Sequence, residues 1–391
     1  MNATVQLVSN PESTSPNLTL FQQASEELVA IPETVKKLRL RRGFTLESAS
    51  AQIGKQKGWA SKIENGNLAL KGEDLERYAE ILEVPVKLMT IDLPAVNAEG
   101  MMFRKYRTPM KTVSRLESEA SVRLHVINRL LEISNQPGAP RFEQIAANTK
   151  EQIVEAAAQT RTRWGIPADT PIGNLAGHLE HDGILLSFLP IEIEKVTGVT
   201  YWHDELTPPL MMLTRQTIDS TKRFTMAHEF AHLVLDKHSA QLESPKDVEA
   251  RADLFAGELL APYEVVKEQF LALKTGDVDG LINLSHYWGL HPKSFVTRAS
   301  LHGDISKDQA SSWYKRLGGI TKRRIENEIP AYPVVFKALG QITDFLETYH
   351  WNMASVLSEV YVRRNDFEQV VGVDNKLSQG AGRASMRLAV G

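Results

Sequence analysis

Cysteine is absent from this chain of 391 residues, and so are long apolar runs. Without cysteine the chain has neither disulfide bonds nor thiolate ligands for a metal. No run reaches the roughly eighteen apolar residues that a transmembrane helix needs. Residues 1–10 carry neither a basic run nor an apolar core, so we expect no signal peptide. Together these absences predict a soluble cytoplasmic protein with no membrane partner.

A strong excess of charge is missing as well, since the formal net charge is −3 at pH 7. The whole chain therefore has no general attraction for nucleic acid or a membrane surface, and any such partner must be recognised by local charge. The apolar content of 42% is enough for large cores. The length predicts two or three domains.

What the chain does contain is the motif H-E-x-x-H, present as His228-Glu229-Phe230-Ala231-His232. On a helix, residues i and i+4 lie about 40° apart, so both imidazoles point toward one spot. Two such nitrogens suit a tetrahedral Zn²⁺ ion. Glu229 lies beside that spot and is free to take a proton from a water bound to the metal.

A chance match on an amphipathic helix is the alternative, because H-E-x-x-H fixes few letters. The surrounding residues favour a metal site instead. Residues 219–221 supply possible N-caps, and the buried side of the helix can be formed by apolar residues at 226, 230, 233 and 235.

Two residues compete for the position of third ligand. His238 would complete the spacing of the metzincin motif, but that motif needs Gly where Leu235 stands. Metzincins also have a Met-turn downstream, and no Met occurs between Met226 and Met353. The sequence therefore favours the second residue, Glu249.

The stretch from Val248 to Pro262 is typical of a second helix that ends at its proline. Glu249 and Asp253 are one turn apart, so both can face the helix that carries the H-E-x-x-H motif. Glu249 would supply the carboxylate of a His₂Glu set, and Asp253 would accept the free N–H of a ligand histidine. The alternative for Glu249 is an ordinary exposed carboxylate, and Glu258 is a weaker rival because it lies more than two turns further on.

The N-terminal part of the chain has a different pattern. Residues 1–30 are rich in Ser, Thr, Asn and Pro, which predicts a flexible arm. Short helices are predicted from Pro32 to Met89, with turns at Gly43 and Gly54. Between residues 33 and 71 there are nine basic and three acidic residues, a local net charge of 9 − 3 = +6. Helices joined by a glycine turn in a basic setting predict a helix-turn-helix DNA-binding domain, with a charged interaction domain as the alternative.

Residues 45–54 and 61–66 resemble the Cro/C1-type (XRE) helix-turn-helix family. In that family the first residues of the third helix contact base edges in the major groove. Carried over to this chain, those positions are Gln56, Lys57, Gly58, Trp59 and Lys62. The resemblance implies double-stranded operator DNA as a partner, and a homodimer on a palindromic site is a further hypothesis.

Between the two motifs the pattern predicts helices at 116–133, 142–159 and 164–181, then strands at 183–190, 199–203 and 210–213. Pro208 and Pro209 before the last strand predict that it lies at the edge of the sheet. We expect one strand of the region 199–213 to pair with an extended substrate. Tyr201 and His203 carry groups that could stabilise an oxyanion, although a structural role is at least as plausible for each.

Residues 183–190, 223–233, 249–262 and 281–317 together resemble the ImmA/IrrE family of metallopeptidases. The resemblance implies zinc-dependent cleavage of a Cro/C1-type repressor. It places the ligand roles on His228, His232 and Glu249 and the role of base on Glu229. Asp253 departs from the family, in which Asn is usual.

These interpretations predict a mainly α multidomain protein. It comprises an all-α helix-turn-helix domain, an α+β zincin-like metallopeptidase domain with a small sheet, and a helical C-terminal region. The expected boundaries are 1–30 for the arm, 31–95 for the DNA-binding domain, 96–165 for a helical connector, 166–320 for the metallopeptidase domain and 321–391 for the C-terminal region with a flexible tail.

The predicted function is a DNA-binding transcriptional regulator fused to a zinc-dependent endopeptidase. Its substrate would be a partner repressor or regulator, a toxin–antitoxin partner, or the protein's own linker. Zn²⁺ is the expected cofactor, although the ligand set also admits another divalent ion such as Mn²⁺. The alternative is a non-proteolytic transcription factor or antitoxin whose metal domain is a sensor or a partner-binding body. Hydrolysis of a small molecule is a third and less favoured reading.

Overall fold

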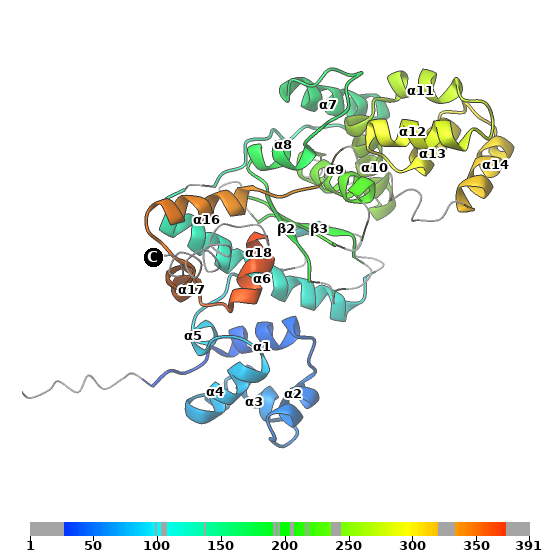
Figure 1. Cartoon of the computed structure of the whole chain (residues 1–391). Helices are drawn as coiled ribbons and strands as arrows, with labels where there is room; N and C mark the ends of the chain where they lie inside the picture. The colour runs from blue at the N-terminus through cyan, green and yellow to red at the C-terminus, as the bar shows by residue number, and fades with distance from the viewer. Residues whose placement is uncertain are drawn as a thin grey trace, which may run out of the picture.

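The computed structural model describes residues 27–372, except for 98–99, 103–107, 137, 191–192, 194–195, 204–206, 216, 218, 236–243, 320–331 and 333. Helices predominate around one small sheet, which confirms the predicted fold class (Figure 1). No helix within the described ranges is both long enough and apolar enough to span a membrane.

The N-terminal helical domain contains α1 to α5, at Pro32–Arg41, Leu46–Gln52, Trp59–Glu64, Gly72–Ile81 and Val86–Met89. The hydroxyl of Thr45 caps α2 by accepting a hydrogen bond of 3.0 Å from the Ser48 amide. The sequence predicts α3 from about Gln56, but the helix begins at Trp59. Gly58 adopts the left-handed region at φ 91°, so the residues before it cannot continue the helix.

The sheet has the strand order β1-β3-β4-β2, with β1 at Met101–Met102, β2 at Leu185–Phe188, β3 at Gly198–Tyr201 and β4 at Leu210–Leu213. The β2–β4 pair is parallel, and the other two pairs are antiparallel. The prediction that 210–213 lies at the edge is wrong, because β4 lies between β3 and β2. Pro208 and Pro209 precede the strand and therefore remove no ladder N–H, and the Pro209 carbonyl accepts a hydrogen bond of 2.8 Å from the Leu185 amide.

Helices cover both faces of this sheet. One face packs against α6 (Met110–Ser134) and the C-terminal helices α16 (Ala338–Thr348), α17 (Met353–Val360) and α18 (Arg364–Val371). The other face packs against α8 (Leu175–His181) and α9 (Asp219–Leu235), followed by α7 (Lys150–Arg163) and α10 (Pro245–Leu260). The remaining helices are α11 (Tyr263–Leu271), α12 (Val278–Trp288), α13 (Pro292–Leu301) and α14 (Lys307–Gly318).

Two predicted helices begin later than the apolar pattern indicates. The sequence predicts a helix over 142–159, but Thr149 and Gln152 form a capping box that starts α7 at Lys150. It also predicts a helix over 164–181, but α8 begins at Leu175, where the side chain of Asn174 accepts a hydrogen bond from the Gly177 amide.

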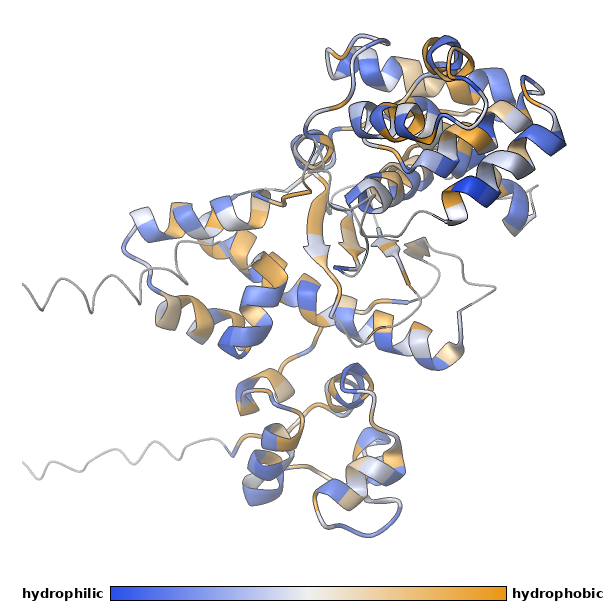
Figure 2. Ribbon diagram, turned by 45° about the vertical axis from the view of Figure 1, so that its right-hand side comes forward, coloured by the Kyte–Doolittle hydropathy of each residue, from blue (hydrophilic) through white to orange (hydrophobic). Residues whose placement is uncertain are grey.

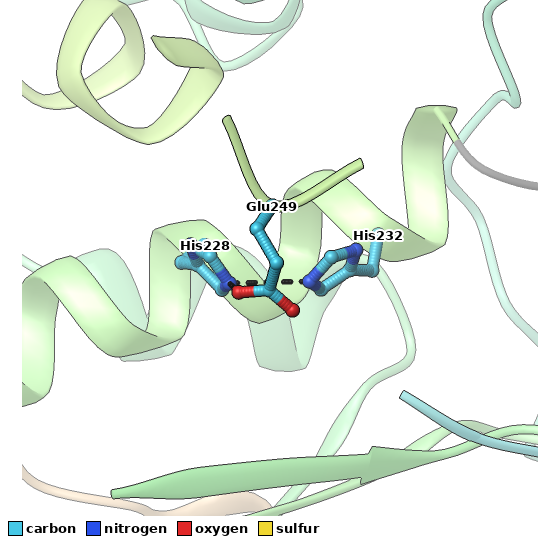
Figure 3. A group of neighbouring side chains, drawn as sticks. All are labelled: His228, His232 and Glu249. Carbon is cyan, nitrogen blue, oxygen red and sulfur yellow. Dashed lines mark hydrogen bonds and ion pairs between the residues drawn. The ribbon is translucent and has the colours of Figure 1, made fainter. Parts of the chain in front are cut away.

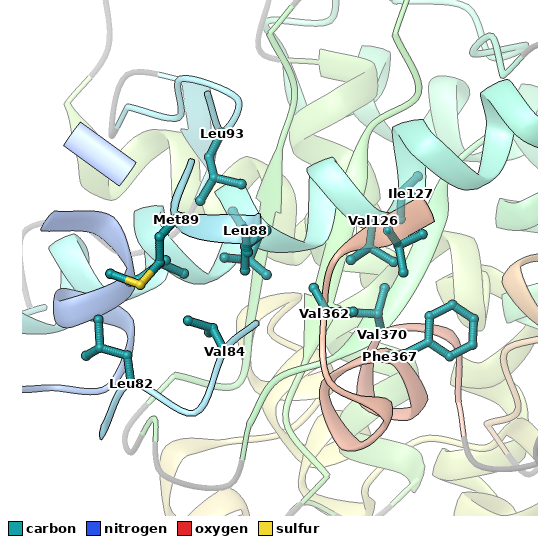
Figure 4. Packing of buried hydrophobic residues seen from close by; sticks show 14 of the residues in the cluster. Leu82, Val84, Leu88, Met89, Leu93, Val126, Ile127, Val362, Phe367 and Val370 are labelled. Atoms are coloured by element: carbon teal, nitrogen blue, oxygen red, sulfur yellow. The ribbon is translucent and has the colours of Figure 1, made fainter. Parts of the chain in front are cut away.

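Apolar residues lie along the strands and on the inner sides of the helices (Figure 2). They form two cores, one on each side of the sheet. The first core continues from the sheet through α6 into the N-terminal helical domain. Figure 4 shows part of it, where side chains from residues 82–93 lie with those of α6 and α18. The domain boundaries expected from the sequence stay a prediction.

A buried ionic network joins the N-terminal helical domain to the rest of the molecule. The guanidinium of Arg41 in α1 binds Glu119 of α6 at 2.8 Å and Asp366 of α18 at 2.7 Å. Glu119 also binds Arg123 at 2.9 Å, and Arg123 donates a hydrogen bond of 2.7 Å to the hydroxyl of Ser187 in β2. The network therefore connects α1 to the central sheet through ion pairs and a final hydrogen bond to Ser187.

We predict that Glu119 stabilises the fold in a pH-dependent way. Burial alone would raise its pKa, but Arg41 and Arg123 lower the pKa from 4.5 to about 2. A depressed carboxyl pKa contributes stability above the unfolded value, so this contribution is lost as the pH falls from about 4.5 toward about 2.

Glu119→Gln should lower the free energy of unfolding by roughly 3–5 kcal/mol at pH 7, because it leaves the buried Arg123 without its carboxylate partner and Arg41 with Asp366 alone. It should also flatten the pH dependence below pH 4.5 in urea titrations. Glu132→Gln, on the exposed side of the same helix, is the matched control and should have little effect. Equal stability of the two variants would contradict the prediction.

Candidate metal centre

The H-E-x-x-H motif lies on α9, as the sequence predicts. His228 and His232 are 8% and 3% exposed, and their rings meet edge to face with centroids 4.8 Å apart. Their Nε2 atoms are 3.1 Å from each other. Helical spacing and packing against β3 and β4 therefore hold both nitrogens at one place.

Glu249 enters from α10. Its Oε2 lies 3.5 Å from Nε2 of His228, and possible ligand atoms of His228, His232 and Glu249 all lie within 4.8 Å of one another. Figure 3 shows the carboxylate between the two imidazoles. Two imidazoles and a carboxylate form a donor set suited to a divalent ion, and the arrangement fits the ligands inferred from the sequence. Their role as ligands stays a prediction.

Of the two rival third ligands, Glu258 does not occupy this position. Glu258 accepts a hydrogen bond of 2.9 Å from the Tyr263 amide and binds Arg298 at 2.5 Å, so its carboxylate is committed to the end of α10. His238 lies outside the described residues.

Asp253 lies one turn after Glu249, and its Oδ1 is 2.8 Å from Nδ1 of His228. This hydrogen bond directs Nε2 of His228 toward Glu249 and His232. Burial alone would lower the pKa of His228, but hydrogen bonds to Asp253 and Glu249 raise it to about 10. The neighbouring carboxylates thus favour positive charge where the ligand atoms converge, whether a proton or a metal ion supplies it.

Glu229 is 4% exposed, and its Oε2 has no hydrogen-bond partner within the described ranges. Burial raises the pKa of this carboxyl group, while His232 and His228 oppose the increase. Beside it lies a cleft of about 290 Å³, lined by residues that include Thr108, Gly198, His228 and Glu229. A small polar molecule such as water can reach the carboxylate through this cleft.

Gly198 is a residue of this site that the sequence reasoning missed. A Cβ atom at this position would lie 2.4 Å from Cγ2 of Thr225 and 3.5 Å from Cγ of Glu229. Only glycine therefore allows β3 to approach α9 so closely. Gly198 is close to the H-E-x-x-H motif in space but not in sequence. Its role therefore could not be predicted before the fold was known.

The two residues that the sequence offers for stabilising an oxyanion, Tyr201 and His203, do not line the cleft beside Glu229. Tyr201 is buried in the core on the opposite face of the sheet, where its hydroxyl donates a hydrogen bond of 3.1 Å to the Ala95 carbonyl. His203 is exposed and does not line the cleft.

In the N-terminal helical domain, the residues expected to contact DNA lie at or just before α3. Gln56, Lys57 and Lys62 are exposed, and Gly58 caps the helix. Trp59 is half-buried, and its ring packs edge to face on Tyr78 with centroids 5.2 Å apart. Trp59 therefore has a packing role in the domain. Contact with DNA by these five residues stays a prediction.

Much of the local positive charge is already paired. Arg39 binds Glu64 at 2.5 Å, Lys55 binds Asp74 at 2.7 Å and Lys57 binds Glu47 at 2.6 Å. Arg41 belongs to the buried network described above. Lys62 has no such partner among the described residues, so the local excess of +6 overstates the charge that a DNA backbone would meet.

We predict that Lys62→Ala weakens binding to double-stranded DNA by about tenfold, since a phosphate or base contact contributes roughly 1–3 kcal/mol. Fluorescence anisotropy at several salt concentrations measures the loss. Lys87→Ala is the control, because Lys87 lies over the ring of Tyr361 on the side facing the C-terminal helices. Equal losses for both variants would argue against α3 as the DNA-contacting helix.

We also predict that Asp253→Asn lowers zinc affinity about 10–100-fold, because the amide holds His228 less well in the tautomer that presents Nε2 to the ion. His228→Ala should abolish stoichiometric binding. Competition with a chromogenic chelator measures both effects. Glu264→Gln, an exposed carboxylate on the next helix, should bind zinc normally. Unchanged affinity in Asp253→Asn would show that the contact has no such role.

Comparison with known protein families finds a match for each of the two motif-bearing regions of the chain. The peptidase M78 family model, described as an IrrE N-terminal-like domain, matches residues 179–300, and a helix-turn-helix domain model matches residues 33–90. No curated protein matches the chain.

Two solved structures show weak similarity. A Mycobacterium tuberculosis transcriptional regulator is 17% identical over 46% of this chain and 51% of its own, about half its length, with a TM-score of 0.28. Bacillus thuringiensis PlcR, solved with the peptide PapR7 and DNA, is 12% identical over 91% of this chain and 98% of its own, with a TM-score of 0.15. From the two family matches, the chain contains an IrrE N-terminal-like domain of the peptidase M78 family, preceded by a helix-turn-helix domain.

Proposed function

We propose that this protein is a DNA-binding transcriptional regulator whose M78 domain hydrolyses peptide bonds, in a partner repressor or regulator. The observation that carries the proposal is the convergence of His228, His232 and Glu249 beside a buried glutamate, Glu229. Zn²⁺ suits two imidazoles and a carboxylate, and Mn²⁺ is the principal alternative.

His228, His232 and Glu249 would hold the ion, and Asp253 would orient His228. A divalent ion held there would act as a Lewis acid, polarising a peptide carbonyl and making water a better nucleophile. Glu229 would take a proton from the attacking water as its oxygen bonds to the carbonyl carbon. As the C–N bond breaks, Glu229 would return that proton to the leaving amine nitrogen.

The sheet supports binding of an extended peptide. β3 lies directly beside α9, and Gly198 brings its backbone close to Glu229. On the side away from β4, β1 pairs only with Thr200 and Tyr201. The backbone of Gly198 and Val199 on that side has no strand neighbour within the described residues. We therefore choose β3, rather than β4, as the strand that would pair with substrate.

The same pairing favours a second candidate function. β1 belongs to the segment that follows the helix-turn-helix domain, and it covers part of β3. That contact suits a non-proteolytic transcription factor or antitoxin whose metal domain is a sensor or partner-binding body. In both functions the operator would be double-stranded DNA, and a homodimer on a palindromic site is expected.

Glu229→Gln separates the two functions. We predict that the variant keeps its zinc content and DNA affinity but loses peptide cleavage by at least about 100-fold, the scale of general-base catalysis. The assay incubates the zinc-loaded chain with repressors encoded beside its gene and identifies new N-termini by mass spectrometry. Glu264→Gln is the control. Cleavage, or regulation in cells, that survives Glu229→Gln would exclude proteolysis by this mechanism.

A further inference from the structure

A second and larger cavity adjoins the metal cleft. It has a volume of about 540 Å³, and its lining residues come from α9, α10, α13 and the start of α7. Figure 1 shows α10 and α13 as neighbouring helices. We call it the α10–α13 groove. Phe224 and Asp253 line both the groove and the metal cleft, so the two cavities are neighbours. The other lining residues are Lys150, Ala250, Leu254, Gly257, Leu290, Lys293, Ser294, Thr297, Arg298, Leu301 and His302.

The groove carries positive charge that the fold does not neutralise. Arg298 is paired with Glu258, and the single acidic residue of the lining, Asp253, is committed to His228. Lys150 and Lys293 are exposed, and neither forms an ion pair within the described ranges. α13 lines the groove along its length, from Lys293 in its first turn to His302 at its C-cap.

The groove also has apolar surface that the fold does not use. Leu254 and Phe224 are half-buried in its wall, while Leu301 at the end of α13 is 79% exposed. His302, the next residue, stacks on Tyr263 with ring centroids 3.7 Å apart and forms a flat side. Apolar surface left exposed next to unpaired cations is typical of a binding site for a partner that is both apolar and acidic.

We propose that the α10–α13 groove binds the part of the peptide substrate that flanks the scissile bond, and that it selects an apolar side chain next to glutamate or aspartate. The proposal rests on the proposed peptidase function, since continuity with the metal cleft is what identifies the occupant as substrate. An apolar side chain would contact Phe224 and Leu301. The carboxylate would lie between Lys150 and Lys293.

The test measures binding separately from cleavage. The zinc-loaded, full-length Glu229→Gln variant is titrated against two fluorescein-labelled peptides that share an apolar core and carry either two glutamates or two lysines. The glutamate peptide should bind about tenfold more tightly. Adding Lys150→Glu and Lys293→Glu should remove or reverse that preference, and Leu301→Ser should weaken both peptides to a similar extent.

The double variant Lys274→Glu, Lys307→Glu is the matched control. Both lysines are exposed near helices α11 and α14, and neither lines the groove. This control should preserve the preference. Equal or undetectable binding of the two peptides would overturn the proposal. So would a loss of DNA affinity, in place of peptide selectivity, in the Lys150→Glu and Lys293→Glu variant.

Cleavage by the wild-type chain is followed in parallel. Selective binding without cleavage would count against the proposed peptidase and leave the groove's preference intact. Cleavage of both peptides at equal rates and with equal affinity would support the proposed peptidase function. It would contradict the proposed selectivity of the α10–α13 groove.

Discussion

The candidate metal centre depends on how closely α9 and α10 pack. Alanines at 227, 231, 252 and 256 are all buried in the core that these helices share. Small side chains allow two helix backbones to approach, and the approach places the Glu249 carboxylate between two imidazoles. The same approach brings Asp253 to the far nitrogen of His228. Without this packing, the histidine pair would have neither its third donor nor its orienting carboxylate.

The sheet has a second role as the link between the two halves of the chain. β3 meets the metal site through Gly198, whereas β2 meets the buried ionic network through Ser187. The hydroxyl of Ser187 also donates a hydrogen bond of 3.0 Å to the Val370 carbonyl, which ties α18 to the sheet. The helix-turn-helix domain therefore shares a core and a charge network with the sheet that lies beside the candidate metal site.

The sequence predicts the local elements of this fold, but it does not predict which distant residues pair. The H-E-x-x-H helix, the helix containing Glu249 and the short strands near 185, 199 and 210 all occur where the patterns predict. The sequence counts the arginines of α1 toward the positive charge that predicts DNA binding, but Arg41 is buried against Glu119 and Asp366, which are 78 and 325 residues away. No local pattern reports partners at such separations. For the same reason, the proline pair at 208–209 could not reveal that β4 is interior.

The sequence by itself determined the kind of chemistry and the short-range geometry, because ligand type and helical spacing are properties of neighbouring residues. It indicated two imidazoles on one turn, a glutamate beside them and a carboxylate pair on the following helix. Only the tertiary structure decided which carboxylate faces the histidines, which strand lies beside Glu229 and which cations are free. Those outcomes depend on packing between segments distant in the chain, where burial and pairing are set by the whole fold.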